Sequence, residues 1–137
     1  MHACVKLAPA ASFKCKILQI KSLKQVDGTI GYGRHGRIAE EGTVIATIPV
    51  GYADGVDRHL SCGRASFLLN GHKVPTIGNI CMDMSMLDIT GIEAKVGDTV
   101  TIFGENPTIS ELAAILGTIP YEILTSVPRR IKRIIVK

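Results

Sequence analysis

The 137-residue sequence contains no tryptophan, and aromatic residues make up only 4% of it. This scarcity excludes a core built mainly from large rings, so we expect Ile, Val, Leu, Ala and Met to form the core. Apolar residues reach 46% and charged residues 20%, which is typical of a soluble globular protein. The length is sufficient for one domain with its own core.

Long apolar runs are also missing: none approaches the roughly 20 residues that span a bilayer, so no membrane partner is expected. Residues 1–11 lack the apolar run of a secretory signal. Without such a signal we expect a reduced, cytoplasmic protein in which Cys4, Cys15, Cys62 and Cys81 are free thiols. No pair of these cysteines has CxxC spacing, so no metal site is expected.

The net charge of +4 is modest, and much of it lies at the C-terminus, in Arg129, Arg130, Lys132, Arg133 and Lys137. A solvated basic terminus accounts for such a run. A nucleic-acid patch is the alternative, and salt-dependent binding of oligonucleotides would favour it. Aromatic stacking groups are absent among these basic residues, so no nucleic-acid partner is expected.

Short alternating segments predict a mainly β chain. Residues 13–21, 84–89 and 99–103 alternate between apolar and polar side chains, at least in part, as half-buried strands do. Residues 43–50 form a more continuous apolar run, which predicts a strand buried on both faces with Pro49 at its end or at a bulge. Asn70-Gly71 predicts a hairpin with a type I′ turn, and a last strand is expected within residues 131–136.

One short helix is predicted between Thr108, which forms a capping box with Glu111, and Gly117, which suits the C′ position. The many short strands with glycine-rich turns favour a single β-barrel-like domain that carries this helix. Residues 1–11 are expected to be a linker or a disordered start, and residues 12–137 to form the domain.

A tyrosine between two glycines is the most informative local feature. Tyr32 lies between Gly31 and Gly33, and glycine allows a backbone or a ligand to approach closely. Arg34 and Arg37 follow, and positive charge nearby favours the phenolate form of tyrosine. The alternative interpretation is a turn with an exposed tyrosine.

Three further segments carry candidate residues. Tyr52 and Asp54 directly follow the buried strand, as in a loop displayed by a scaffold or in an ordinary polar turn. Met82 and Asp83 lie in a segment that also reads as the start of a core strand. Tyr121 follows the predicted helix. The alternative to a functional role is a tyrosine at the edge of the core whose hydroxyl is solvated.

In their order and spacing, these segments resemble the C-terminal domain of alanine racemase. The resemblance covers roughly residues 13–133. It is carried by Gly31-Tyr32-Gly33, Ile48-Pro49-Val50-Gly51-Tyr52-Ala53-Asp54-Gly55, Ile80-Cys81-Met82-Asp83, Tyr121-Glu122 and Val127-Pro128-Arg129. The segments are also similar to racemase domains fused behind a cell-wall ligase that adds D-alanyl-D-alanine.

The resemblance implies a homodimeric isomerase that converts L-alanine to D-alanine for peptidoglycan and cell-wall biogenesis. In this family an N-terminal α/β barrel holds pyridoxal phosphate on a lysine, and the C-terminal domain covers the partner subunit's active site. By motif position Tyr32 is the tyrosine that acts as an acid–base group opposite that lysine. A free tyrosine has a pKa of about 10, so a base at neutral pH needs positive charge nearby.

The resemblance assigns roles to five more residues. Tyr52 would line the entrance of the partner's active site, and Arg58 matches an arginine of the substrate corridor. Met82 would offer its backbone to the substrate carboxylate, with Asp83 beside it. Tyr121 matches the tyrosine that hydrogen-bonds the cofactor phosphate in its own subunit.

Asn79 departs from the pattern, because many relatives carry Arg there, and the charge of that part of the corridor is therefore open. The chain cannot contain a barrel of well over about 200 residues. We therefore expect negligible activity and no bound cofactor for these residues alone, and self-association through apolar surface. A purely structural or dimerisation domain without a catalytic group is a further alternative, after the nucleic-acid-binding module.

Overall fold

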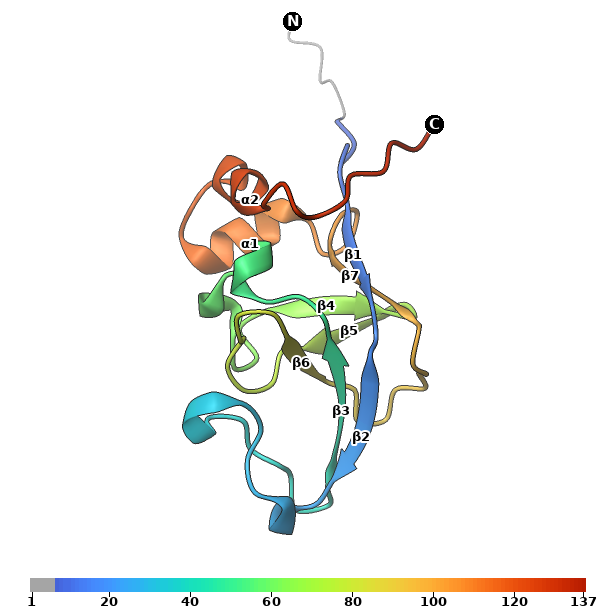
Figure 1. The fold of residues 1–137 in the computed structure, drawn as a ribbon, viewed down its shortest axis with the longest axis vertical. Coiled ribbons are helices and arrows are strands. Elements are labelled where there is room, and N and C mark those ends of the chain that lie inside the picture. The colour runs from blue at the N-terminus through green and yellow to red at the C-terminus, as the bar shows by residue number, and fades with distance from the viewer. Residues whose placement is uncertain (1–6) are drawn as a thin grey trace, which may run out of the picture.

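The computed structural model describes residues 7–137, in which seven strands form two antiparallel sheets (Figure 1). The four-stranded sheet has the order β1-β7-β4-β5, and the three-stranded sheet has the order β2-β3-β6. The strands are β1 Phe13–Lys16, β2 Gln19–Leu23, β3 Thr43–Ile48, β4 Ser66–Leu69, β5 His72–Pro75, β6 Ser85–Asp88 and β7 Thr99–Phe103. The prediction of a mainly β domain is confirmed.

The strands of the described residues do not form a closed barrel. Within residues 7–137, each sheet keeps its own edges, and a single isolated bridge between Thr76 and Leu87 links the β5 side to the β6 side. The expectation of a barrel is therefore corrected to two adjoining sheets. Short strands and glycine-rich turns are common to both architectures, so composition did not separate them.

The segment expected as one strand over residues 13–21 is two strands in different sheets. Ile17 is buried at 1% exposure, and its backbone bonds the turn before β7, where it accepts from Gly97 and donates to Asp98. The next amide, that of Leu18, donates to Thr47 of β3. The chain thus changes sheets between residues 17 and 18.

The predicted hairpin and the position of Pro49 are confirmed. β4 and β5 pair in register from Leu69–His72 to Ser66–Pro75, and Asn70 and Gly71 both have positive φ, at 49° and 80°. These angles are those of a type I′ turn. β3 ends at Ile48, directly before the proline.

There are two helices in the described chain rather than one. α1, Ile109–Leu116, has the predicted capping box, in which Thr108 accepts from the Glu111 amide, and Gly117 ends it with φ 66°. α2, Pro120–Ser126, was not predicted. The expected strand over 131–136 is also wrong, because these residues form no strand and Ile135 is 93% exposed.

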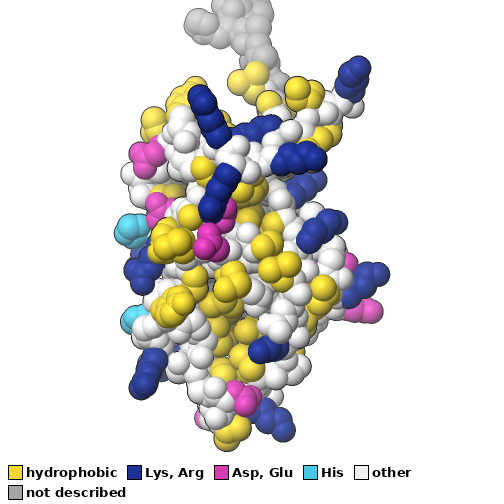
Figure 2. Space-filling model, in the orientation of Figure 1, with side chains coloured by type: hydrophobic (Ala, Val, Ile, Leu, Met, Phe, Trp, Pro, Cys, Tyr) yellow, Lys and Arg dark blue, Asp and Glu magenta, His cyan; other side chains and the backbone are white. Residues whose placement is uncertain are grey.

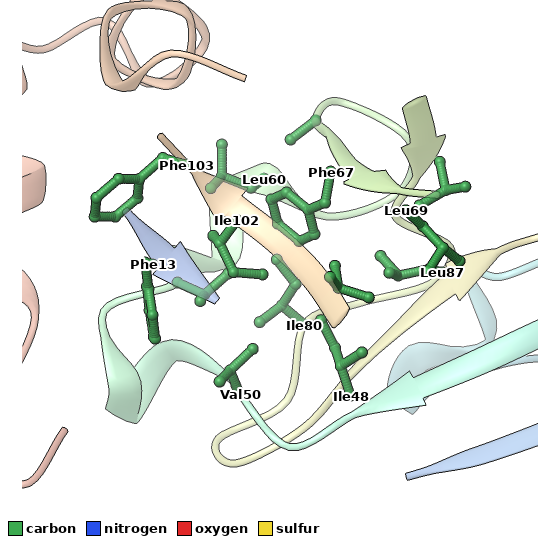
Figure 3. Packing of buried hydrophobic residues seen from close by; sticks show 14 of the residues in the cluster. Phe13, Ile48, Val50, Leu60, Phe67, Leu69, Ile80, Leu87, Ile102 and Phe103 are labelled. Carbon is green, nitrogen blue, oxygen red and sulfur yellow. The ribbon is translucent and has the colours of Figure 1, made fainter. Parts of the chain in front are cut away.

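The main core joins both sheets and both helices (Figure 3). Phe67 and Leu69 of β4 and Ile102 of β7 pack toward Ile48 and Leu87 of the other sheet. The scarcity of aromatics did not keep them out of the core: Phe13, Phe67 and Phe103 are all buried, and Phe13 and Phe103 meet edge to face at 5.8 Å. Methionine contributes less than expected, since none of Met82, Met84 and Met86 is among the buried residues.

A second, smaller cluster of Ile30, Ile38 and Ile45 lies where the long β2–β3 connection returns to β3. This connection extends away from the end of the molecule that carries α1 and α2 (Figure 1). The small cluster anchors the base of the loop on which Tyr32 stands. Residues 7–12 are exposed and precede β1; the rest of the segment expected as a linker, residues 1–6, lies outside the described residues.

Candidate functional site

Three segments far apart in the sequence meet around one open cleft of about 390 Å³. The segments are the β2–β3 connection, the turns after β3 and the loop before β6. Five of the six candidate residues line this cleft: Tyr32, Tyr52, Arg58, Met82 and Asp83. Asn79, Ile80, Cys81 and Met84 complete the lining. The fold therefore brings together residues that the sequence placed in separate motifs.

Tyr32 projects from a tight turn on the rim of the cleft. It begins a 3₁₀ turn, Tyr32–Arg34, and its side chain is 75% exposed. Gly31 and Gly33 have φ of 74° and 75°, in the left-handed region that favours glycine, and Arg34 shares it at 57°. Below the turn, Ile30 and Gly36 exchange backbone hydrogen bonds of 2.9 and 3.2 Å, which close the loop at its base.

The turn that carries Tyr52 is joined to the loop that carries Met82 by direct backbone contact. The amides of Tyr52 and Ala53 donate to the carbonyls of Cys81 and Met82, both at 3.0 Å. Gly51 permits this approach, because a Cβ there would lie 2.6 Å from the Met82 carbonyl carbon. The Met82 amide itself forms no hydrogen bond within residues 7–137, so it remains available to a ligand.

A buried carboxylate ties these loops to the segment after α2. Asp54 is 6% exposed; it accepts from the Gly51 amide at 3.0 Å and from Arg130 Nε and Nη2 at 3.1 and 2.7 Å. Arg130 Nη2 also lies 3.2 Å from Asp83 Oδ1, and these two carboxylates raise the pKa of Arg130. The sequence prediction treated Arg130 as part of a solvated terminus. The signal for its role was Asp54 itself: a carboxylate that closely follows an apolar strand is expected to be buried and to need a cation from elsewhere in the chain.

The last two candidate residues differ in their relation to the cleft: Arg58 lines it and Tyr121 does not. Arg58 starts a 3₁₀ turn, Arg58–Leu60, which Asp57 caps by accepting from the His59 amide at 2.8 Å. Tyr121 lies in α2, is 74% exposed and is not part of the cleft. It is the one candidate that the fold does not bring to the others.

The chain contains three tyrosines, Tyr32, Tyr52 and Tyr121, and all three share one property. Their side chains are exposed, and none of their hydroxyls forms a hydrogen bond within residues 7–137. A phenol that is exposed and without a partner in its own domain is free to bond an outside group.

Apolar side chains surround the cleft. Met82 is 54% exposed, and Met84, Tyr52 and Tyr32 are exposed beside it. On the face seen in Figure 2, hydrophobic side chains form an interrupted band down the middle, with Lys and Arg mostly to its sides. Exposed apolar surface with a polar rim is typical of a site that meets another protein surface or a ligand.

The cysteines of the described chain, Cys15, Cys62 and Cys81, are free, and Cys4 lies outside it. Burial raises the pKa of Cys15 to about 12. No cluster of His, Cys, Asp or Glu that could hold a metal ion occurs among residues 7–137. The helices of this part of the chain are all too short or too polar to cross a bilayer.

Residues 10–135 match a family model described as alanine racemase, C-terminal domain. The chain is 41% identical to alanine racemase 1 of Clostridium acetobutylicum, over 97% of this chain and 35% of that protein. It is 38% identical to the alanine racemase of Aquifex pyrophilus, over 97% of this chain and 38% of that protein. The chain thus spans about a third of the length of these curated relatives.

Solved structures give the same result. The alanine racemase of Clostridium difficile 630 in complex with cycloserine is 39% identical, with a TM-score of 0.84 over 93% of this chain and 33% of that chain. The alanine racemase of Bartonella henselae with covalently bound pyridoxal phosphate is 35% identical, with a TM-score of 0.81 over 90% of this chain and 34% of that chain.

Proposed function

This chain belongs to the alanine racemase family, whose C-terminal domain it forms, and we propose that it serves a pyridoxal-phosphate-dependent enzyme that interconverts L- and D-alanine. The observation that carries the proposal is the family match over residues 10–135 together with an exposed tyrosine on the rim of the cleft. The D-alanine would supply peptidoglycan synthesis in the cytoplasm.

Racemisation removes a proton from one face of the α-carbon and returns a proton on the other face, so it needs two opposed acid–base groups. Tyr32 suits one of these roles, because its hydroxyl is exposed and has no partner within residues 7–137. The substrate it reaches would be held by another part of the protein. The opposed group would be a lysine of an N-terminal domain.

The remaining cleft residues suit the binding of a small amino acid. The free Met82 amide can donate to the substrate carboxylate, and Arg58 adds a positive charge to the same cleft. Tyr52 would line the entrance, and Asp83 would stay beside Met82 through its contact with Arg130.

Tyr121 is the residue of this chain that we assign to the cofactor. Its exposed hydroxyl is free to donate a hydrogen bond to a phosphate oxygen, which is the chemistry that the phosphate of pyridoxal phosphate requires. When bound, the cofactor would delocalise the negative charge left on the α-carbon. Because Tyr121 lies away from the cleft, it would serve a different active site of a homodimer from the one that Tyr32 serves.

The three tyrosines allow matched Tyr→Phe variants in the full-length protein, each lacking only one hydroxyl oxygen. Tyr32→Phe should lower kcat by about 10²- to 10⁴-fold, because it removes an acid–base group. Tyr121→Phe should weaken cofactor binding, and Tyr52→Phe should act mainly on KM for alanine. Racemisation is followed in both directions by circular dichroism, with the cofactor content measured by absorbance.

If Tyr32→Phe retains nearly full turnover in both directions at normal cofactor content, Tyr32 is not an acid–base group and the proposed role is wrong. Circular dichroism and urea unfolding provide the control for folding. The exposed Tyr32 hydroxyl has no hydrogen-bond partner within residues 7–137, so its loss should leave stability unchanged.

A further inference from the structure

We propose that Asn79 is a positioning residue that fixes the Tyr32 turn over the cleft, an inference that rests on the acid–base role proposed for Tyr32. The Asn79 side chain donates a hydrogen bond from Nδ2 to the backbone carbonyl of Tyr32, at 2.9 Å. The two residues lie in different loops, so this bond joins the β2–β3 connection to the loop before β6.

The Tyr32 turn needs such support because few hydrogen bonds from other segments hold it. Its side chain is exposed, so core packing does not set its direction. Gly31 and Gly33 have positive φ, and glycine restricts the backbone least of all residues. Above the Ile30–Gly36 pair, the Asn79 bond is the only hydrogen bond that reaches residues 31–35 from elsewhere in the described chain.

Asn79 stands on a rigid base from which it can hold the turn. The preceding Gly78 packs so closely on Ile30 that a Cβ there would lie 2.6 Å from the Ile30 carbonyl oxygen. The following Ile80 is 2% exposed, and its amide donates to Ser61 Oγ at 2.8 Å. Both neighbours of Asn79 are therefore fixed, one against the base of the Tyr32 loop and one in the core.

The amide group of Asn79 is also oriented. Cys62 Sγ lies 3.7 Å from Asn79 Oδ1, which suits a weak S–H donor and leaves Nδ2 directed at the Tyr32 carbonyl. The Asn79 Nδ2 would lie only 3.3 Å from a Cβ on Gly33, so the turn rests directly against this side chain. The Asn79 side-chain amide thus fixes the position of the turn that carries the Tyr32 side chain, through one hydrogen bond and one close contact.

The experiment uses Asn79→Asp in the full-length protein, because this change keeps the shape and removes the donor. A misplacement of about 1 Å at a reacting group can cost about 100-fold, so we expect kcat/KM to fall by about 10- to 100-fold. Since L- and D-alanine have equal free energies, kcat/KM must fall equally in both directions. Asn79→Ala, which also removes the donor but adds no charge, should give the same result.

The decisive measurement is the primary isotope effect with α-deuterated L- and D-alanine. Displacing Tyr32 slows only the proton transfers that Tyr32 performs. The isotope effect on kcat/KM should therefore rise in the direction in which Tyr32 removes the proton and fall in the other. A loss of folded or cofactor-loaded protein would lower the rate and leave both isotope effects unchanged.

The chain offers a matched control. Asn70 in the β4–β5 turn donates from Nδ2 to Glu93 and Asp98, away from the cleft, so Asn70→Asp should change neither kcat/KM nor the isotope effects. If Asn79→Asp turns over like the wild type, or is slower with both isotope effects unchanged, the positioning role is wrong. Tyr32→Phe measured in parallel separates the two proposals: if it loses activity while Asn79→Asp does not, only this inference fails.

Discussion

Replacement of Gly51 by alanine tests whether close backbone packing holds the two cleft loops together. Gly51 has φ −144° and ψ −161°, which is extended backbone that alanine also adopts. Any cost therefore comes from space. The added methyl group would lie 2.6 Å from the Met82 carbonyl carbon and closer still to the carbonyl oxygens of Cys81 and Met82. These are backbone atoms and cannot rotate away as a side chain can.

The expected loss of stability follows from the contacts that must open. Separating the loops breaks the hydrogen bonds that Tyr52 and Ala53 donate to Cys81 and Met82, worth about 1 kcal/mol each. Overpacking adds about 1–3 kcal/mol. We therefore expect Gly51→Ala to destabilise the domain by about 3–5 kcal/mol, a large share of the total stability of about 5–15 kcal/mol that is usual for a domain.

Urea unfolding of the domain measures this loss, since a single domain is the simplest case for two-state treatment. With a slope of about 1–3 kcal/mol/M, the midpoint should fall by at least about 1 M at an unchanged slope. Gly71→Ala is the matched control, because nothing lies within 4 Å of its Cβ position and only its positive φ opposes alanine. If Gly51→Ala costs no more than Gly71→Ala, the loops are not held by this contact.

Three further predictions concern stability, reactivity and association. Thr108→Ala should destabilise the domain by about 1 kcal/mol, measured by urea unfolding, because it removes the side-chain cap of α1; no change would mean that water replaces the cap. Burial raises the pKa of Cys15 from 9.0 to about 12, so iodoacetamide at pH 8 should modify the exposed Cys62 first and Cys15 only on unfolding, as peptide mass spectrometry can show. Because the folded pKa is the higher one, this contribution to stability is complete below about pH 9 and is lost as the pH rises toward 12. The isolated 137-residue domain should self-associate through the exposed tyrosines and methionines of the cleft; a monodisperse monomer at high concentration in sedimentation would contradict this.

Local signals in the sequence were sufficient where neighbouring residues decide the structure. The Asn70-Gly71 turn and the start and end of α1 depend on residues within one turn of each other, and both predictions are confirmed. α2 has no side-chain cap and spans only Pro120–Ser126, so its stability depends on packing through the buried Ile123. Sequence periodicity does not report that packing.

Long-range pairing decided what the sequence did not reveal. The change of sheet at Ile17 depends on the partners Gly97 and Asp98, which lie far along the chain. Residues 131–136 have suitable strand composition but find no partner strand. In the cleft, the motifs suggested Tyr32 and Met82, while the bonds from Asn79 and Arg130 depend on tertiary contacts.

The contact between Arg130 and Asp54 has a practical consequence for anyone who shortens this protein. The residues after α2 look dispensable, since they form no regular element and most are exposed. A deletion from Pro128 onward would nevertheless remove the counter-ion of Asp54, a carboxylate buried beside the cleft. The C-terminal boundary of any shortened version therefore belongs beyond Arg130. Low activity of a version that ends earlier would not by itself contradict the acid–base role proposed for Tyr32.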